Sequence, residues 1–540
     1  MEHGVIVTHQ PLIPKVKDDY QGWVDKASKY IVQELLVEKK VELAVPELAA
    51  PLYRAPYDAF RGTHDFDPMV HQFGQRLNGL AKVPVGAFNG KLIGDPTETR
   101  KNARGNYVAP RLVEKFGTGL NLQYDTQDAL GNYATLAERY CCNKKNYVLD
   151  ESARTLARQI AEHAFAELID PEKLRQAAHD IKAGTVYQDW LRKAKDAAYA
   201  ASHDLFSEES DRIVRYHGKA ITKAKSEITF DGVFKVGQGI SAWSKGANSF
   251  FGAACRIGAQ LQTASFRDEV VFNNGMSEEE AVGRFMKAAS KLPTFEGVTL
   301  DVTQMDSRIN GFIFAILAAF DKLCLLDEEF VDLYYSMCED YQMMSEEVKM
   351  VLSWVMTSGA PWTLKGNTNV VGILECWLFQ GEGPWARFWQ GDDGRRNQAK
   401  LRLRRDRAEQ LALYTGFEMK MEFSMFGDLC GFIFSHGLVV PSIRRKLVKL
   451  IGTEFSSADH FYQYQISLRQ WCDKINGALC NSDIFTINAE NNGVSEFTVE
   501  EWYATISSVS HLSYAQFSEL AVRIRKEQHF LNARGHLETV

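Results

Sequence analysis

The chain has 540 residues, of which 45% are hydrophobic and 24% charged, and its formal net charge is −7. This length leaves room for roughly three or four domains with large cores, and the composition is that of a globular protein. The negative net charge argues against a generic nucleic-acid coat protein, although an enzyme that threads nucleic acid needs only a basic channel.

Two further features exclude other classes. The nine cysteines include no C-x-x-C pair, which predicts reduced thiols and argues against a disulfide or zinc framework. The longest apolar run, Gly311–Phe320, has about half the length that a membrane-spanning helix needs. We therefore expect no intrinsic membrane span.

The first part of the chain changes character near Tyr216. Residues 150–201 have apolar side chains at helical spacing, and Asp170 and Pro171 are suited to begin the second helix there. After Tyr216 the segment 227–236 has the pattern of a strand, with cations on both sides. This change from helical spacing to a strand pattern predicts a domain boundary near Tyr216.

The second part begins with a predicted buried strand at Gly297–Asp306. The segments 307–323 and 328–352 then have the apolar spacing of helices. From about Gly452 to the end, the pattern predicts mostly helices.

Three carboxylates lie where predicted strands end. Asp301 comes late in its strand, whereas Asp392 and Asp393 would occupy the tip of a hairpin whose first strand is 386–390. Gly391 would permit the tight turn. Carboxylates are ligands that Mg²⁺ prefers, and a two-metal site for phosphoryl transfer needs such a set. The alternative is three solvated loop aspartates, because Gly-Asp-Asp is also a common turn.

The segment between these acids is Ser358–Thr368. Gly359 and Pro361 predict a loop that opens a helix. Thr363 and Asn367 are four residues apart and therefore share a face of that helix. A hydroxyl and an amide on one face can recognise a ribose hydroxyl. An ordinary capped helix would explain Ser, Gly and Pro, but not Thr and Asn together.

In this order, the motifs resemble those of the RNA-directed RNA polymerases of plus-strand RNA viruses. D-x-x-x-x-D at Asp301–Asp306, S-G-x-x-x-T-x-x-x-N-T at Ser358–Thr368 and G-D-D at Gly391–Asp393 are similar to the palm motifs A, B and C. The alphavirus-like supergroup fits best.

Other segments narrow the resemblance. Lys225–Lys245 is similar to the fingers motif of that supergroup, and KVGQGISAWSK within it is most similar to hepevirus polymerases. Thr415–Phe423 and Gly427–Phe432 resemble palm motifs D and E. The likeness covers about Lys219 to Gly437.

The resemblance implies two Mg²⁺ or Mn²⁺ ions at the acids. Asp301 and Asp392 would bind both ions, Asp393 would be a weaker ligand, and the backbone carbonyl of Val302 would contribute. Lys420 is the implied general acid for the departing pyrophosphate. The alternative for Lys420 is a strand residue that faces water.

The resemblance also implies a nucleotide site. Asp306 would lie opposite Asn367 and help to select ribonucleotides through the 2′-hydroxyl. Ser358 and Gly359 would form a mobile loop, and Thr363 would support the pocket. The triphosphate would be held by three lysines, each of which has a solvated surface cation as its alternative: Lys225, Lys235 and Lys245.

The implied fold class is α+β, a right-hand polymerase with an antiparallel palm sheet and largely helical fingers and thumb. The implied boundaries are an N-terminal extension and fingers at 1–215, fingers with the nucleotide-entry motif at 216–295, a palm at 296–450 and a thumb at 451–540. The palm would contain a helical insertion at about 326–357.

The implied partners are the RNA template, nascent RNA, nucleoside triphosphates and other replicase domains such as a helicase and a capping enzyme. The implied location is the host cytoplasm, in replication complexes that other subunits attach to membranes.

One segment departs from the family pattern. Seven cations lie between Arg395 and Arg407, with Asp406 as the single acid. This run predicts a short second hairpin strand and a helix that begins near Gln398. Its cations would contact the RNA backbone or form a solvated helix face.

Three other interpretations stay open. Gly237-x-Gly239-x-x-Ala242 follows a strand-like run and mimics a dinucleotide-binding turn. A palm-fold protein that binds RNA without catalysis would be free to lose its acids. A reverse transcriptase shares the palm, but typically has a bulky residue in place of the Asp306 and Asn367 pair.

Overall fold

The structure is a computed structural model of the chain. It describes residues 90–92, 121–124, 135–136, 139–140, 149–181, 212–219, 222–225, 238–302, 305–339, 341–345, 348–435, 437–453, 455, 457–478 and 483–520. The chain divides into two compact units. The first unit takes its described residues from within 1–97, 132–218 and 239–424, and the second from within 98–131, 219–238 and 425–540.

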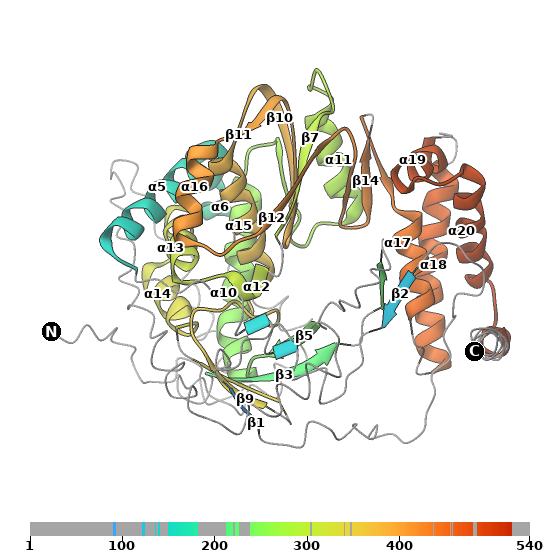
Figure 1. Cartoon of the computed structure of the whole chain (residues 1–540), viewed down its shortest axis with the longest axis horizontal. Helices are drawn as coiled ribbons and strands as arrows, with labels where there is room; N and C mark the ends of the chain where they lie inside the picture. The colour runs from blue at the N-terminus through green and yellow to red at the C-terminus, as the bar shows by residue number, and fades with distance from the viewer. Residues whose placement is uncertain are drawn as a thin grey trace, which may run out of the picture. The chain divides into compact units, whose positions relative to one another are not determined.

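The centre of the first unit is a five-stranded sheet in the order β12-β7-β11-β10-β6 (Figure 1). All neighbours in it are antiparallel except β10 and β6, which are parallel. The predicted strand at Gly297–Asp306 is confirmed as β7 for Gly297–Val302, but its predicted end is wrong, because Met305 and Asp306 begin the short helix α12. The strands are β6 (Val270–Phe272), β7 (Gly297–Val302), β10 (Phe379–Gln390), β11 (Asp393–Leu403) and β12 (Met419–Ser424).

Helices surround this sheet, with α15 and α11 flanking it in Figure 1. Helix α13 is apolar on all sides from Phe312 to Phe320, as suits a helix enclosed by protein, and near its end it buries Asp321 and Lys322. Asn310 caps it by accepting a hydrogen bond from the Ile313 amide. The helices are α5 (Glu151–Leu168), α6 (Pro171–Asp180), α10 (Lys245–Ser265), α11 (Glu278–Ala289), α12 (Met305–Arg308), α13 (Gly311–Leu323), α14 (Glu328–Ser336), α15 (Thr363–Leu378) and α16 (Arg405–Tyr414).

The predicted helix starts are confirmed at α6 and α15. The side chain of Asp170 accepts hydrogen bonds from the amides of Glu172 and Lys173, and Pro171 occupies the first helical position. After the Ser358–Pro361 loop, α15 begins at Thr363.

A second five-stranded sheet has the order β1-β9-β8-β3-β5. The prediction that 328–352 is helical throughout is wrong, because α14 ends at Ser336 and two strands follow. Residues 341–344 alternate between buried and half-buried side chains, which is the two-residue period of a strand. The strands are β1 (Gly90–Leu92), β3 (Ile213–Lys219), β5 (Gln238–Ala242), β8 (Tyr341–Met344) and β9 (Val348–Leu352).

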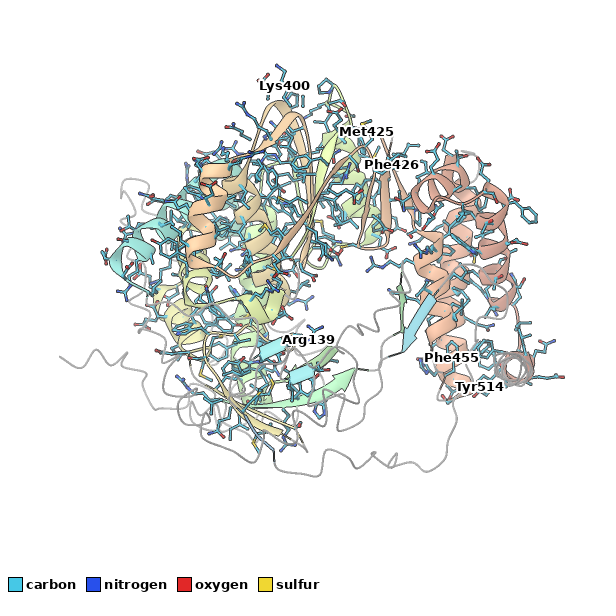
Figure 2. All side chains as sticks on the ribbon, in the orientation of Figure 1. Arg139, Lys400, Met425, Phe426, Phe455 and Tyr514 are labelled. Atoms are coloured by element: carbon cyan, nitrogen blue, oxygen red, sulfur yellow. The ribbon has the colours of Figure 1, made fainter. Side chains whose placement is uncertain are left out.

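In its described residues, the second unit is mostly helical from 443 to 520, which confirms the prediction of helices from about Gly452 over that range. Its small sheets are β2-β4 and β13-β14-β15. Its core is apolar; the rings of Phe455 and Phe461 are 5.2 Å apart, and Figure 2 shows Phe455 near Tyr514 at one end of α18. The elements are β2 (Asn121–Tyr124), β4 (Thr222–Lys225), β13 (Gly427–Leu429), β14 (Phe432–Ser435), β15 (Leu438–Pro441), α17 (Ile443–Gly452), α18 (Ala458–Ala478), α19 (Asp483–Asn492) and α20 (Glu496–Val509).

Within the described ranges, we find no helix with the length and apolar character to cross a membrane.

Candidate active site

The Gly-Asp-Asp triplet forms the end of the β10–β11 hairpin, as predicted. Gln390 pairs with Asp393, so Gly391 and Asp392 make a two-residue loop. Gly391 has φ of +64°, and the two-residue hairpin turns require a positive φ at this first central position, which favours glycine there. The Gly391 amide donates a hydrogen bond to Thr368 Oγ1 of α15 at 2.8 Å, which fixes the turn to that helix.

Strand register brings the predicted catalytic residues together. Asp301 of β7 pairs with Asp393 of β11 on one side and with Lys420 of β12 on the other. Directly opposed residues of antiparallel strands point to the same face, with Cβ atoms about 4.5–5.5 Å apart. Lys420 Nζ lies 3.3 Å from Asp301 Oδ2. Both side chains are accessible, at 66% and 44% exposed.

Asp392 lies beside the same strand. The Val302 amide donates to the Asp392 carbonyl oxygen at 3.4 Å, which connects the end of β7 to the turn. Asp392 and Asp301 are therefore neighbours in the fold, although 90 residues separate them in the sequence. Of the four residues that the sequence predicts for catalysis, Asp301, Asp393 and Lys420 lie on three adjacent strands of one sheet, and Asp392 lies in the turn next to them.

The donor set fits a hard divalent ion, because its side chains offer carboxylate oxygens. In the portion of the chain that the structure describes, however, no three His, Cys, Asp or Glu side chains are gathered closely enough to form a ready-made metal cluster. Like charges repel when no cation lies between them, and Asp301 is turned to Lys420. To hold a shared ion, the carboxylates would have to rotate from this arrangement.

Asp306 and Asn367 meet as predicted. Asn367 Nδ2 of α15 donates to Asp306 Oδ1 of α12 at 2.5 Å. Burial raises the pKa of Asp306 to about 6, and the nearby charge of Asp392 adds to this increase while the bond from Asn367 opposes it. Asn367 Oδ1 is buried and accepts no hydrogen bond, so this amide retains an unused acceptor beside the acids.

The Ser358–Gly359 loop is held by β5, which belongs to the predicted fingers motif. Ser358 Oγ donates to the Gly239 carbonyl at 2.9 Å. A Cβ on Gly359 would lie 1.8 Å from the Ser241 carbonyl oxygen, so only glycine fits this close approach. Thr363 Oγ1 donates to the Thr357 carbonyl and closes the loop onto α15.

The described residues do not test the three predicted triphosphate lysines. Lys225 ends β4 in the second unit, and Lys245 is the first residue of α10. Lys235 lies outside the described residues. Their role in the nucleotide site stays a prediction.

The same region argues against a dinucleotide-binding turn. Gly239 lies inside strand β5, where a Cβ would clash with the Tyr216 ring at 1.9 Å. This glycine is therefore explained by close packing within a sheet. A phosphate-binding turn would instead place it between the strand and the helix.

The Arg-rich segment corrects the sequence prediction. Strand β11 continues to Leu403 and α16 begins only at Arg405, so a helix from Gln398 is wrong. Arg395 and Arg396 are 0% and 3% exposed, which excludes both a solvated helix face and a contact with RNA for these two. Arg395 instead donates to Thr299 Oγ1 at 2.8 Å.

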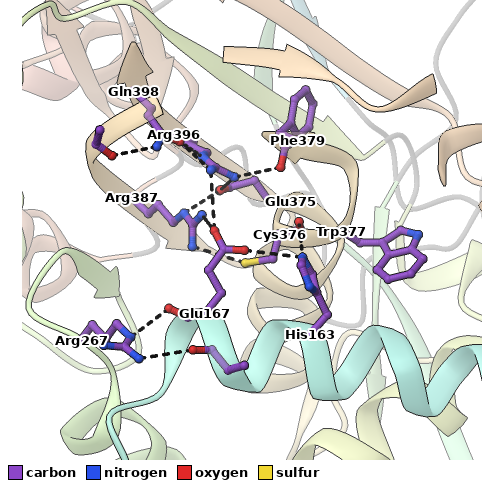
Figure 3. A network of polar contacts seen from close by, with 12 residues as sticks. His163, Glu167, Arg267, Glu375, Cys376, Trp377, Phe379, Arg387, Arg396 and Gln398 are labelled. Carbon is purple, nitrogen blue, oxygen red and sulfur yellow. Dashed lines mark hydrogen bonds and ion pairs between the residues drawn. The ribbon is translucent and has the colours of Figure 1, made fainter. Parts of the chain in front are cut away.

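Arg396 belongs to a buried ionic network that the sequence did not reveal. Figure 3 shows Glu167 of α5 and Glu375 of α15 between Arg387 and Arg396 of the hairpin. Arg387 Nε lies 2.9 Å from Glu375 Oε1, and Arg387 Nη2 also contacts Glu167. Trp389 Nε1 donates to Glu375 Oε2 at 2.6 Å. The network attaches both hairpin strands to helices α5 and α15. The sequence feature that points to it is Glu375, a carboxylate within an otherwise apolar helical segment.

Comparison with known proteins gives the family. Residues 136–481 match the family described as RNA dependent RNA polymerase. The "Replicase" of Beet necrotic yellow vein virus is 30% identical over 385 residues, which cover 70% of this chain and 18% of that protein.

Two other relatives agree with this match. The "Methyltransferase/helicase/RNA-directed RNA polymerase" of Nudaurelia capensis beta virus is 24% identical over 55% of this chain and 15% of its own length. The "Non-structural polyprotein pORF1" of Hepatitis E virus genotype 3 is 25% identical over 47% of this chain and 15% of its own length.

This chain therefore spans less than a fifth of each of these curated relatives. The matches confirm the resemblance to polymerases of plus-strand RNA viruses that the motifs predict, hepeviruses included. The family match covers more than half of the chain, and we conclude that this chain belongs to the RNA dependent RNA polymerase family.

Proposed function

We propose that this chain is the polymerase portion of a larger viral replicase and copies an RNA template into RNA. The reaction joins the α-phosphate of a nucleoside triphosphate to the 3′-hydroxyl of the growing strand and releases pyrophosphate. The observation that carries the proposal is the cross-strand row of Asp393, Asp301 and Lys420 beside the Asp306–Asn367 pair. Family membership supports the same chemistry.

Asp301 and Asp392 would hold two divalent ions, with Asp393 and the Val302 carbonyl as further oxygen donors. The family generally uses divalent metal ions, and we propose that the ions are Mg²⁺ or Mn²⁺. Such ions, when bound, neutralise charge on the phosphates and activate the attacking hydroxyl. Removing Asp392 should therefore abolish catalysis without unfolding the sheet, since its side chain lies in a turn.

Lys420 is suited to deliver a proton to the leaving pyrophosphate. Its ammonium group is exposed and 3.3 Å from Asp301, so it reaches the acids without being buried. The ion pair with Asp301 would be exchanged for the triphosphate as the substrate enters. Lys225, Lys235 and Lys245 would supply further positive charge to the triphosphate.

Asp306 and Asn367 would select the sugar. Asn367 already donates to Asp306, and its free Oδ1 can accept a hydrogen bond from a 2′-hydroxyl after a small movement. A deoxynucleotide would leave these polar groups without that partner, which disfavours it. The pair therefore favours RNA products over those of a reverse transcriptase. Ser358 and Gly359 would move with the template, and Thr363 would steady their loop.

The domain arrangement is also proposed by analogy with the family. The sheet β12-β7-β11-β10-β6 would be the core of a palm at 296–450, with fingers at 1–215 and 216–295 and a thumb at 451–540. RNA, nucleoside triphosphates and neighbouring helicase and capping domains would be the partners. We further propose that other subunits bring the chain to cytoplasmic replication membranes; flotation of the purified chain alone with liposomes would contradict this.

The test is incorporation of labelled ribonucleotide on an RNA template with Mg²⁺ or Mn²⁺. Wild-type chain should extend the product, and chelation of the metal should stop it. Asp392→Ala should abolish extension, whereas Asp459→Ala, at an exposed acid of α18, should leave it unchanged. Equal extension by Asp392→Ala and wild type would refute the proposed site and favour an RNA-binding role without catalysis.

A further inference from the structure

Helix α15 carries a second polar surface that faces away from the acids. Lys365 is only 3% exposed, and its Nζ lies 2.5 Å from Oδ1 of Asp321 on α13, which is completely buried. The ammonium group also lies 3.7 Å from the centre of the Trp362 ring. A buried cation of this kind is costly unless its partner and geometry are well matched.

Asp321 connects this lysine to two further helices. Gln262 Nε2 of α10 donates to Asp321 Oδ1 at 2.8 Å, and the Tyr335 hydroxyl of α14 donates to Asp321 Oδ2 at 2.8 Å. Gln262 Oε1 in turn accepts a hydrogen bond from Asn369 Nδ2 of α15 at 2.9 Å. We call these five residues the Asp321 network.

The network holds α15 at two points that are one turn apart. Lys365 and Asn369 are four residues apart and share a helix face, whereas Asn367 lies about 200° around the helix from Lys365. That opposite face points Asn367 to Asp306. A rotation of α15 about its axis would therefore change the contacts of Lys365 and Asn369 with the Asp321 network and the contact of Asn367 with Asp306 at the same time.

Apolar packing alone would permit small rotations of this helix. Buried hydrogen bonds to a carboxylate are directional, so the Asp321 network favours one setting of α15. Lys365 and Asp321 do not contact the nucleotide site themselves. Their effect on the reaction would pass through the orientation of Asn367.

We propose that Lys365 and Asp321 are positioning residues for sugar selection: their buried pair sets the rotation of α15 at which Asn367 meets Asp306 and an incoming ribose. This inference rests on the proposed polymerase function and on the role proposed for Asn367. It adds a specificity determinant made of Asp321, which lies outside the polymerase motifs, and Lys365, which occupies a position within Ser358–Thr368 to which the motif assigns no role.

The test compares Lys365→Met with Lys322→Met. Lys322 is a matched control, because it is also a buried lysine and its Nζ lies 3.0 Å from Asp332, but that pair joins α13 to α14 and does not contact α15. For each purified variant, kcat/KM is measured for CTP and for dCTP on one RNA template, together with the thermal midpoint.

We expect both variants to lower the thermal midpoint. Lys365→Met should reduce the ratio of kcat/KM for CTP to that for dCTP by about tenfold or more, because a displaced Asn367 amide no longer makes a hydrogen bond to the 2′-hydroxyl. Lys322→Met should keep this ratio within about twofold of wild type. An unchanged ratio in Lys365→Met, or an equal loss in both variants, would overturn the inference.

If Lys365→Met does not fold, the double variant Lys365→Met with Asp321→Asn removes both charges. The carboxamide keeps one oxygen that can accept from Gln262, and its amide group can donate to the Tyr335 hydroxyl. The double variant should fold and still discriminate poorly; full discrimination would overturn the inference. Asn367→Ala separates this failure from failure of the proposed function. If wild type incorporates no CTP, or if Asn367→Ala keeps full discrimination, the proposed function or sugar site fails instead.

Discussion

The buried sides of α15 and α18 have opposite chemistry. Helix α15 is buried along nearly its whole length, and its buried side chains include six polar ones: Thr363, Lys365, Asn367, Thr368, Asn369 and Glu375. Helix α18 buries mainly apolar side chains in the core of the second unit: Phe461, Leu468, Cys472 and Ile475.

The difference shows what each helix must do. An apolar core holds α18 by shape and tolerates small adjustments, since dispersion and hydrophobic contacts are not directional. The polar contacts of α15 are directional, and they fix the Gly391 turn, the Asn367 amide that we propose reads the sugar, and the β10–β11 hairpin relative to one another. We therefore expect substitutions in α15 to be harmful when they change the polarity of a side chain but not its shape. Substitutions in α18 should be harmful when they change the size of a side chain.

The largest predicted effect is at Glu375. Glu375→Gln keeps the shape but removes the charge between Arg387 and Arg396, which should cost about 3–5 kcal/mol of the free energy of unfolding. The measurement is urea denaturation. The matched control is Glu382→Gln on the same hairpin, whose exposed pair with Lys400 (labelled in Figure 2) should leave the midpoint unchanged. An equal change in the free energy of unfolding for the two variants would contradict the claim that buried polar contacts hold α15 in place.

A smaller loss is expected in the second unit. Leu468 is fully buried in α18, so Leu468→Ala should cost about 2–4 kcal/mol by leaving a cavity. Leu468→Met nearly conserves volume and should cost less than about 1.5 kcal/mol. Chemical denaturation of the two variants measures this sensitivity to size, and equal costs would argue against it.

Thr368→Val tests the contact between α15 and the catalytic turn. The change keeps the shape but removes the acceptor of the Gly391 amide, so the turn should shift and kcat should fall by about 10²-fold. Single-turnover extension measures this step. Thr505→Val makes the same change on the exposed side of α20 and should have no effect on kcat. Wild-type kcat in Thr368→Val would show that the bond does not position the turn.

The smallest predicted effect is a pH dependence of stability. The pKa of Asp306 is about 6 in the folded chain against 3.8 ordinarily, so the unfolded chain releases this proton at lower pH. Stability should therefore fall as pH rises from about 4 to 6, by about 1–2 kcal/mol for this half-buried group. Asp306→Asn should remove this decrease in chelator-containing buffer. Parallel stability curves for variant and wild type would contradict the assignment.

The sequence predicts well where the residues of the candidate site lie, because local rules determine the elements that carry them. Gly391 marks the turn, Gly297–Asp306 has the pattern of a buried strand, and Pro361 precedes the helix start at Thr363. Register between strands then brings Asp301 and Asp393 together, and the motif order of the family predicts that pairing. The three lysines of the fingers motif stay a prediction.

The rest depends on contacts between distant residues. Arg396 resembles a surface cation in the sequence, but it is buried against Glu167 of α5 and Glu375 of α15, each 3.6 Å away, and its guanidinium also donates to Gln398. Lys365 likewise depends on Asp321, which lies inside an apolar helical run. The strands at 341–352 were predicted as helix because the alternation in their short apolar runs is weak. Charge counting along the chain cannot distinguish a paired buried ion from a solvated one.

The central claim is that Asp301 and Asp392 converge on a pair of divalent ions. The direct measurement is a crystal structure with Mn²⁺ and a nonhydrolysable nucleotide, in which anomalous scattering locates the metal. We predict two peaks about 3.5–4 Å apart between these carboxylates, with Lys420 turned from Asp301 toward the phosphates. Ions bound elsewhere, or carboxylates that still point away from them with nucleotide present, would contradict the account.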